Sequence, residues 1–207
     1  MAWAPDYCTA AQLKSWLRIG DTADDTLLAV AITAASRDVD QYCGRQFGAL
    51  STAEARYYTW SGDLIDGRAA LAVDDLQSVT DLEVQLLDTT GAAAGSPLVS
   101  GTDFDLWPYN AAAKGRPWTH LVARPNGTAW TELARSVVIE ARWGWTAVPS
   151  SVLQATLLTA AETFARRNAP FGIAGSPEMG SELRLLSRID PDAARLLNPF
   201  KRHWGAV

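Results

Sequence analysis

The sequence predicts an α+β fold: mainly a helical bundle of about four to five helices, with a β-rich insertion between the second and third helices. Apolar residues recur with helical period towards both ends of the chain. In the middle of the chain, apolar residues form short runs rich in Val, Leu, Tyr and Trp, which are separated by Gly, Asp and Pro turns. The composition, 48% hydrophobic and 20% charged over 207 residues, is that of a globular protein. We expect a helical core (1–55 and 143–198), the β-rich insertion (56–142) and a C-terminal tail (199–207).

Two helices are predicted near the start. Thr9 and Gln12 have the spacing of a capping box, and apolar residues follow at helical intervals, so a helix is expected over about 10–18, with Gly20 as its left-handed stop. A second helix is expected to begin at the cap offered by residues 22–25 and to continue to Gly44. Its apolar face comprises Leu28, Ile32, Ala35, Val39, Tyr42 and Cys43.

The β-rich insertion contains six predicted strands. They are Arg56–Trp60, Ala69–Val73, Leu82–Leu87, Phe104–Trp107, His120–Ala123 and Val137–Trp143. Turn residues at 88–91 and 125–128 separate strands from one another.

Helical signals return after Pro149. Ser151 and Gln154 have capping-box spacing, and the apolar face that follows reaches Arg167. A Gly- and Pro-rich loop is then expected, and its hinge residues are Phe171, Gly172, Gly175, Pro177 and Gly180. Asp190 followed by Pro191 predicts the start of a last helix that ends at Leu197.

Composition also excludes several classes of protein. The longest apolar run, Leu27–Ala35, is far too short for a membrane span, and residues 1–6 do not resemble a signal peptide, so a cytoplasmic origin is the default expectation. Cys8 and Cys43 are predicted to be buried free thiols. With two cysteines and two histidines, no zinc-ligand spacing exists, and we expect neither a metal nor another cofactor.

Charge is distributed unevenly. Residues 1–110 carry 6 Lys+Arg and 16 Asp+Glu, whereas residues 111–207 carry 12 and 7, within a net charge of −5. The asymmetry suggests two surfaces with different partners, and an ordinary solvated charge distribution is the alternative. The arginines of the second part are not clustered like those of a nucleic-acid-binding arm.

No catalytic constellation stands out. The aspartate pairs 63/66, 74/75 and 103/105 lie at predicted strand ends and turns, where Asp commonly accepts backbone hydrogen bonds. Neither histidine has the context of a catalytic triad, and no phosphate-binding loop is present. We therefore do not expect an enzyme.

Nine tryptophans are more than a small core usually buries. Trp3 and Trp204 lie close to the ends of the sequence, where they are expected in interfaces with other proteins. Packing of these side chains back onto their own domain is the alternative.

The order of these signals resembles the head-to-tail connector (head-completion adaptor) proteins of long-tailed DNA bacteriophages. The first part of the resemblance consists of the segment 13–19, the acidic pair 24–25 and a helix that ends in the segment 42–47. The second part is the strand and Gly-Trp pair of 138–145, followed by Val148-Pro149, a helix to Arg167 and the ending 188–202.

The resemblance implies a homo-oligomeric ring under the portal, commonly a dodecamer, in the virion neck of a particle made in the host bacterial cytoplasm. Its implied partners are the portal protein and the next neck (stopper) or tail protein. DNA would pass through the ring's channel without sequence-specific binding, and no membrane is involved.

Residue roles follow from that resemblance. The implied portal contacts are Phe200, Lys201, Arg202, His203 and Trp204, with the loop of residues 171–180 as the hinge that lets them move. Acidic side chains facing the channel would repel the DNA backbone, and the candidates are Asp63, Asp66, Asp74 and Asp75. The alternatives are a tail-completion or terminator protein, and a small phage hydrolase that uses the clustered aspartates.

Overall fold

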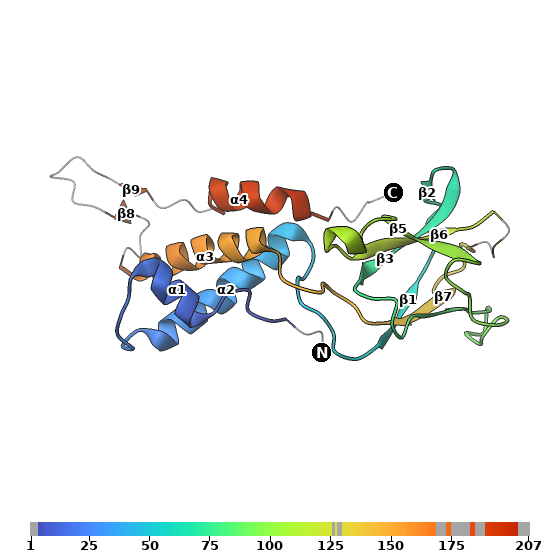
Figure 1. The fold of residues 1–207 in the computed structure, drawn as a ribbon, viewed down its shortest axis with the longest axis horizontal. Coiled ribbons are helices and arrows are strands. Elements are labelled where there is room, and N and C mark those ends of the chain that lie inside the picture. Colours follow the sequence, from blue (N-terminus) through green and yellow to red (C-terminus); the bar gives the residue numbers. More distant parts are fainter. Residues whose placement is uncertain are drawn as a thin grey trace. The chain divides into compact units, whose positions relative to one another are not determined.

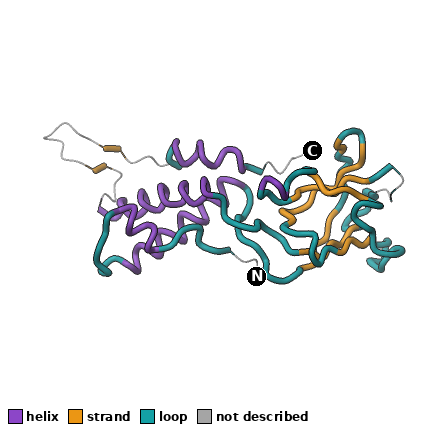
Figure 2. The backbone as a smooth tube through the Cα atoms, in the orientation of Figure 1, coloured by secondary structure: helices purple, strands orange, loops and turns teal. Residues whose placement is uncertain are grey.

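A computed structural model of the chain describes residues 4–125, 127, 130–168, 173–174, 183–184 and 189–202 (Figure 1). The chain divides into two units. Gly48–Ala147 contains two β-sheets, and we call it the sheet unit. Ala4–Phe47 and the chain from Val148 onward contain the four α-helices, and we call this part the helical unit (Figure 2).

The prediction of a mainly helical bundle is wrong. Within the described residues the structure has four α-helices and seven strands in two antiparallel sheets, and 33% of these residues are helical and 24% are in strands. A short additional pair is formed by β8 (Ile173–Ala174) and β9 (Leu183–Arg184). The physical reason is that the strands bury a hydrophobic core of their own, which includes Leu71, Val84, Phe104, Ile139 and Trp143. The β-rich stretch is therefore a second folded unit and not an appendage of a bundle.

The first two helices are α1 (Ala10–Leu17) and α2 (Asp25–Cys43). The capping box is confirmed, because the backbone amide of Gln12 donates to Thr9 Oγ1 (3.2 Å) and the backbone amide of Thr9 donates to the side-chain Oε1 of Gln12 (2.8 Å). The predicted stop at Gly20 is wrong: Arg18 takes the left-handed conformation with φ 57° and ends α1 earlier. Gly44, with φ 62°, ends α2 as predicted.

The later helices are α3 (Ser150–Ala165) and α4 (Pro191–Leu197). The capping box predicted at Ser151 is wrong, because α3 already begins at Ser150 and the amides of Val152 and Leu153 donate to Pro149 O. The cap predicted for α4 is confirmed, since Asp190 accepts hydrogen bonds from the amides of Asp192 and Ala193. None of the described helices combines the length and the apolar character needed to cross a bilayer.

The helical unit has its core between α1, α2 and α3. The fully buried side chains of Leu13, Leu28 and Ala35 pack there with Ala160. Cys8 lies in the same cluster.

One sheet has the strand order β1-β7-β4 and the other has the order β2-β3-β6-β5, and all pairs are antiparallel. The strands of the first sheet are β1 (Glu54–Tyr58), β4 (Glu83–Leu86) and β7 (Val137–Ala141). Those of the second are β2 (Leu64–Ile65), β3 (Arg68–Leu76), β5 (Phe104–Trp107) and β6 (Trp118–Ala123). The two-residue strand β2 is absent from the prediction because it is too short to show alternation.

Cys8 and Cys43 are free and buried, as predicted. Burial raises the pKa of Cys8 to about 11 and that of Cys43 to about 12, so both thiols stay protonated near neutral pH. Because the thiolate is the reactive form, we expect a colorimetric thiol reagent to modify neither residue in the folded protein and both after denaturation. Rapid modification of one thiol in the native protein would contradict this burial.

Candidate docking site at the end of the second helix

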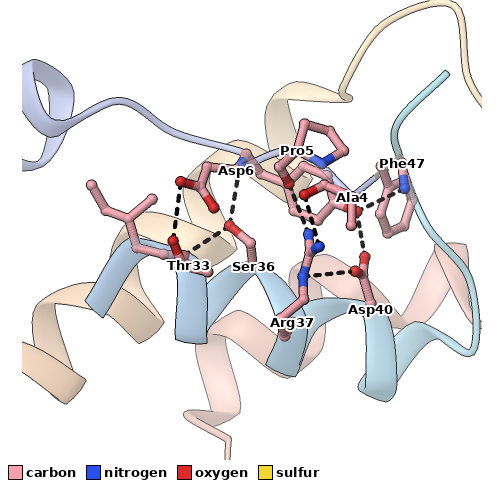
Figure 3. Close-up of polar contacts among 10 residues, drawn as sticks. Ala4, Pro5, Asp6, Thr33, Ser36, Arg37, Asp40 and Phe47 are labelled. Carbon is pink, nitrogen blue, oxygen red and sulfur yellow. Dashed lines mark hydrogen bonds and ion pairs between the residues drawn. The ribbon is translucent and has the colours of Figure 1, made fainter. Parts of the chain in front are cut away.

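The segment Ala4–Cys8 lies along α2 and forms what we call the N-terminal strap (Figure 3). Arg37 holds the first residues of the strap by donating hydrogen bonds to Ala4 O (2.9 Å) and Pro5 O (2.8 Å). Further along, the Tyr7 amide donates to Ser36 Oγ (3.1 Å) and Thr33 Oγ1 donates to Asp6 (3.2 Å). Side chains of α2 thus satisfy backbone hydrogen-bonding groups of the strap.

Tyr7 connects the strap to the end of α2. Its hydroxyl donates to the carboxylate of Asp40 and accepts a hydrogen bond from the Phe47 amide (2.9 Å). Burial raises the pKa of Tyr7, and its contact with the Asp40 carboxylate adds to that effect. Burial also raises the pKa of Asp40, against the opposing effects of the Tyr7 hydrogen bond and the Arg37 charge.

On the other side of Phe47 lies the base of the C-terminal tail, residues 198–202, which we call the tail root. It follows α4 directly, and its first residues form a 3₁₀ turn, Asn198–Phe200. The Tyr42 hydroxyl donates to Asn198 Oδ1 (2.8 Å), and the Arg202 amide donates to Cys43 O (2.7 Å). These two bonds place the root against the last turn of α2.

Aromatic contacts reinforce the placement of the root. The Phe200 ring meets Phe47 edge to face at 5.7 Å between centroids, and Phe47 meets Tyr7 in the same manner at 5.7 Å. Lys201 Nζ lies 3.8 Å from the centre of the Tyr42 ring, within the range of a cation–π interaction. The strap and the tail root therefore share one buried ring, Phe47, which is 1% exposed.

Several residues predicted for docking lie outside the described part of the chain. His203 and Trp204 are among them, as are all five hinge residues: Phe171, Gly172, Gly175, Pro177 and Gly180. Of the predicted portal contacts, the structure describes Phe200, Lys201 and Arg202, and brings them together in the tail root. The sequence prediction missed the residues that hold the root, Tyr42 and Phe47. Their signal was local: aromatic side chains on either side of the glycine that ends α2.

The four aspartates predicted to face a channel lie in different surroundings. Asp66 is exposed in the two-residue turn between β2 and β3, where φ is 52° at Asp66 and 74° at Gly67. Asp63 is partly exposed and accepts from Ser61 Oγ (2.8 Å). Asp74 accepts hydrogen bonds from Arg56 (2.8 Å) and the Tyr58 hydroxyl (3.0 Å). Asp75 is buried and accepts from Trp145 Nε1 (2.8 Å).

The partners of the aspartate side chains bear on whether these groups could act as catalytic acids or bases. The carboxylates of the neighbouring residues Asp74 and Asp75 bind different partners, Arg56 with Tyr58 and Trp145 respectively. Asp105 lies between Arg68 (3.1 Å) and Arg124 (2.9 Å). Although burial opposes the shift, the hydrogen bonds from these two arginines lower the pKa of Asp105. Among the described residues, no three His, Cys, Asp or Glu side chains gather as a metal site would require.

Comparison with models of protein families gives a match to the first part of the chain. Residues 9–88 match the model of the phage gp6-like head-tail connector proteins. The match begins at the N-cap of α1 and extends beyond β4, so it covers parts of both units. It confirms the predicted resemblance to head-to-tail connectors.

Solved structures share the fold over the whole chain. A chain of the "virion of native gene transfer agent (GTA) particle" aligns with a TM-score of 0.56 and 20% identity, covering 100% of this chain and 96% of that one. Chains from the neck of the empty and of the native GTA particle, computed with C6 and C12 symmetry, align with a TM-score of 0.52, 18% identity and the same coverage. A comparison with curated protein sequences gave no significant match.

Proposed function

We propose that this protein is a structural adaptor in the neck of a phage or phage-like particle, where it forms a ring under the portal and docks the next neck or tail protein. The observation that carries the proposal is the connector-family match over residues 9–88, which includes both helices and strands. Fold likeness to chains of a particle neck supports the same location. The C12 symmetry named for one of those necks supports a twelve-membered ring.

The proposed role is mechanical and not catalytic. The carboxylates of Asp74 and Asp105 are held by arginines, as expected of groups that stabilise a sheet. The burial of Asp75 beside Trp145 supports a structural role for that residue also.

Within this role, the C-terminal tail is the proposed contact with the portal protein. The root binds the end of α2 through Phe200, Lys201 and the Arg202 amide, so the chain beyond Arg202 starts from a defined position. We assign His203 and Trp204 as the principal portal anchors because aromatic side chains dominate protein–protein hot spots. Residues 171–180 are the proposed hinge.

The DNA channel is the second part of the proposal. Asp66 is exposed at the tip of the β2–β3 turn, and Asp63 is partly exposed just before β2. We propose that these two carboxylates face the channel and repel the phosphate backbone, so that DNA passes without sequence-specific binding. The buried Asp75 and the arginine-paired Asp74 are not included in this surface.

The experiment that tests the adaptor proposal is co-purification with the portal protein of the same particle. We expect the intact chain to bind, and Trp204→Ala to weaken binding by roughly 30-fold or more, as loss of a hot-spot anchor does. Tyr57→Ala is the matched control, because Tyr57 is 51% exposed and belongs to the sheet unit. Capture of a tail-tube protein in place of the portal protein would favour the tail-completion alternative and overturn the proposal.

A further inference from the structure

One face of α2 carries exposed apolar side chains. Leu27 and Val30 are 51% and 63% exposed, and Ala34 continues the same face at helical spacing. The N-terminal strap covers the adjacent face, through Thr33 and Arg37, but leaves these three residues accessible. We call Leu27, Val30 and Ala34 the α2 stripe.

A second apolar surface lies between α1 and α3. It is a groove lined by Trp16, Leu153 and Leu157 together with Ala11, Gln12, Ser15 and Arg18. Trp16 is 48% exposed although its ring is large and apolar. An exposed tryptophan beside aliphatic side chains is typical of a site that another protein covers.

The charges beside the two surfaces are opposite. Arg18 lies at the groove, whereas Asp38 follows Ala34 by one helical turn and is exposed. Within the described residues, neither Arg18 nor Asp38 has an ion-pair partner. Other charges near them are paired, since Lys14 binds Asp25 at 2.7 Å and Arg37 binds Asp40 at 3.2 Å.

We infer that the α2 stripe of one copy packs into the α1–α3 groove of the next copy, with Asp38 of the first facing Arg18 of the second. Contacts between two different surfaces of identical chains are heterologous, and they close into a ring when the rotation between neighbours permits it. Both surfaces belong to the helical unit, and they lie on different helices. The inference rests on the proposed adaptor function and specifies which residues join neighbours.

Crosslinking tests this contact. The variant Val30→Cys/Leu153→Cys places one reactive thiol on each surface, while Cys8 and Cys43 remain buried. With a short bifunctional maleimide, we expect a ladder of multimers from the double variant, both free at high concentration and bound to portal protein. The control pair Tyr57→Cys/Leu153→Cys should give no ladder. Absence of a ladder in both samples, or dimers from Val30→Cys alone, would overturn the inference.

A charge exchange provides the second test. We expect Arg18→Glu and Asp38→Lys each to reduce the yield of multimers by roughly tenfold, and the double variant to restore it, because like charges face each other only in the single variants. If the double variant stays as defective as the singles, the pairing is wrong. Portal binding by the intact chain without any ladder would refute this contact and leave the adaptor function standing, whereas a ladder without portal binding would refute the adaptor function alone.

Discussion

Gly144→Ala is expected to destabilise the sheet unit by at least about 3 kcal/mol, because it combines backbone strain with a steric clash. Gly144 has φ 113°, which side chains rarely allow, and a Cβ there would lie 1.9 Å from Gly48 O. The neighbouring backbone cannot easily move away, since the Gly144 amide donates to Asp75 O and the Trp145 amide donates to Gly48 O (2.8 Å). Denaturant unfolding followed by tryptophan fluorescence measures the loss, because Trp143 and Trp145 are buried nearby.

Gly101→Ala is the matched control for that experiment. Gly101 also has a positive φ, 82°, but apart from its two chain neighbours no described residue has an atom within 4 Å of the position its Cβ would take. This substitution therefore tests strain without the clash, and a loss of about 1–3 kcal/mol is expected. Equal destabilisation by the two variants would show that the close approach of Gly48 to Gly144 has no energetic consequence.

Phe47→Ala is expected to cost about 3–5 kcal/mol and to loosen the strap and the tail root together. Its ring is 1% exposed and contacts both Tyr7 and Phe200 at 5.7 Å between centroids. Hydrogen exchange measured by mass spectrometry should therefore increase in peptides from residues 4–9 and 198–202 in the same variant.

Phe47→Leu is the control, since it keeps most of the apolar volume and removes the edge-to-face contacts. We expect a smaller loss of stability, about 1–3 kcal/mol, the order of two aromatic pair contributions. If faster exchange in Phe47→Ala is confined to one of the two segments, the strap and the root do not depend on a shared ring.

In the proposed function, the contacts of Phe47 with Tyr7 and Phe200 determine where the portal-binding segment begins. A tail rooted at Phe47 loses less conformational freedom on binding than one that leaves the domain after α4 at Leu197. Loosening the root should accordingly weaken portal binding even though Phe47, being buried, cannot itself touch the portal protein.

The sequence alone determined the elements whose signals are local. The Thr9–Gln12 capping box, the glycine at the end of α2 and the Asp190-Pro191 start of α4 each depend on residues within one or two turns. The strand Phe104–Trp107 was likewise predicted with its observed bounds. The ordered set of such signals was also enough to indicate a resemblance to the head-tail connectors, and the match over residues 9–88 confirms that resemblance.

Only the tertiary structure decided the rest. That the strands form a unit with its own core, and not an addition to a bundle, depends on contacts such as Trp130 Nε1 to Ala69 O across 61 residues. The docking site joins Tyr7 to Phe47 across 40 residues and Tyr42 to Asn198 across 156. Capping and periodicity concern neighbours a few residues apart, whereas these contacts form only when distant segments are buried together. A local pattern can therefore single out Tyr42 and Phe47 as aromatic side chains near the end of a helix, but it does not tell which distant residues they contact.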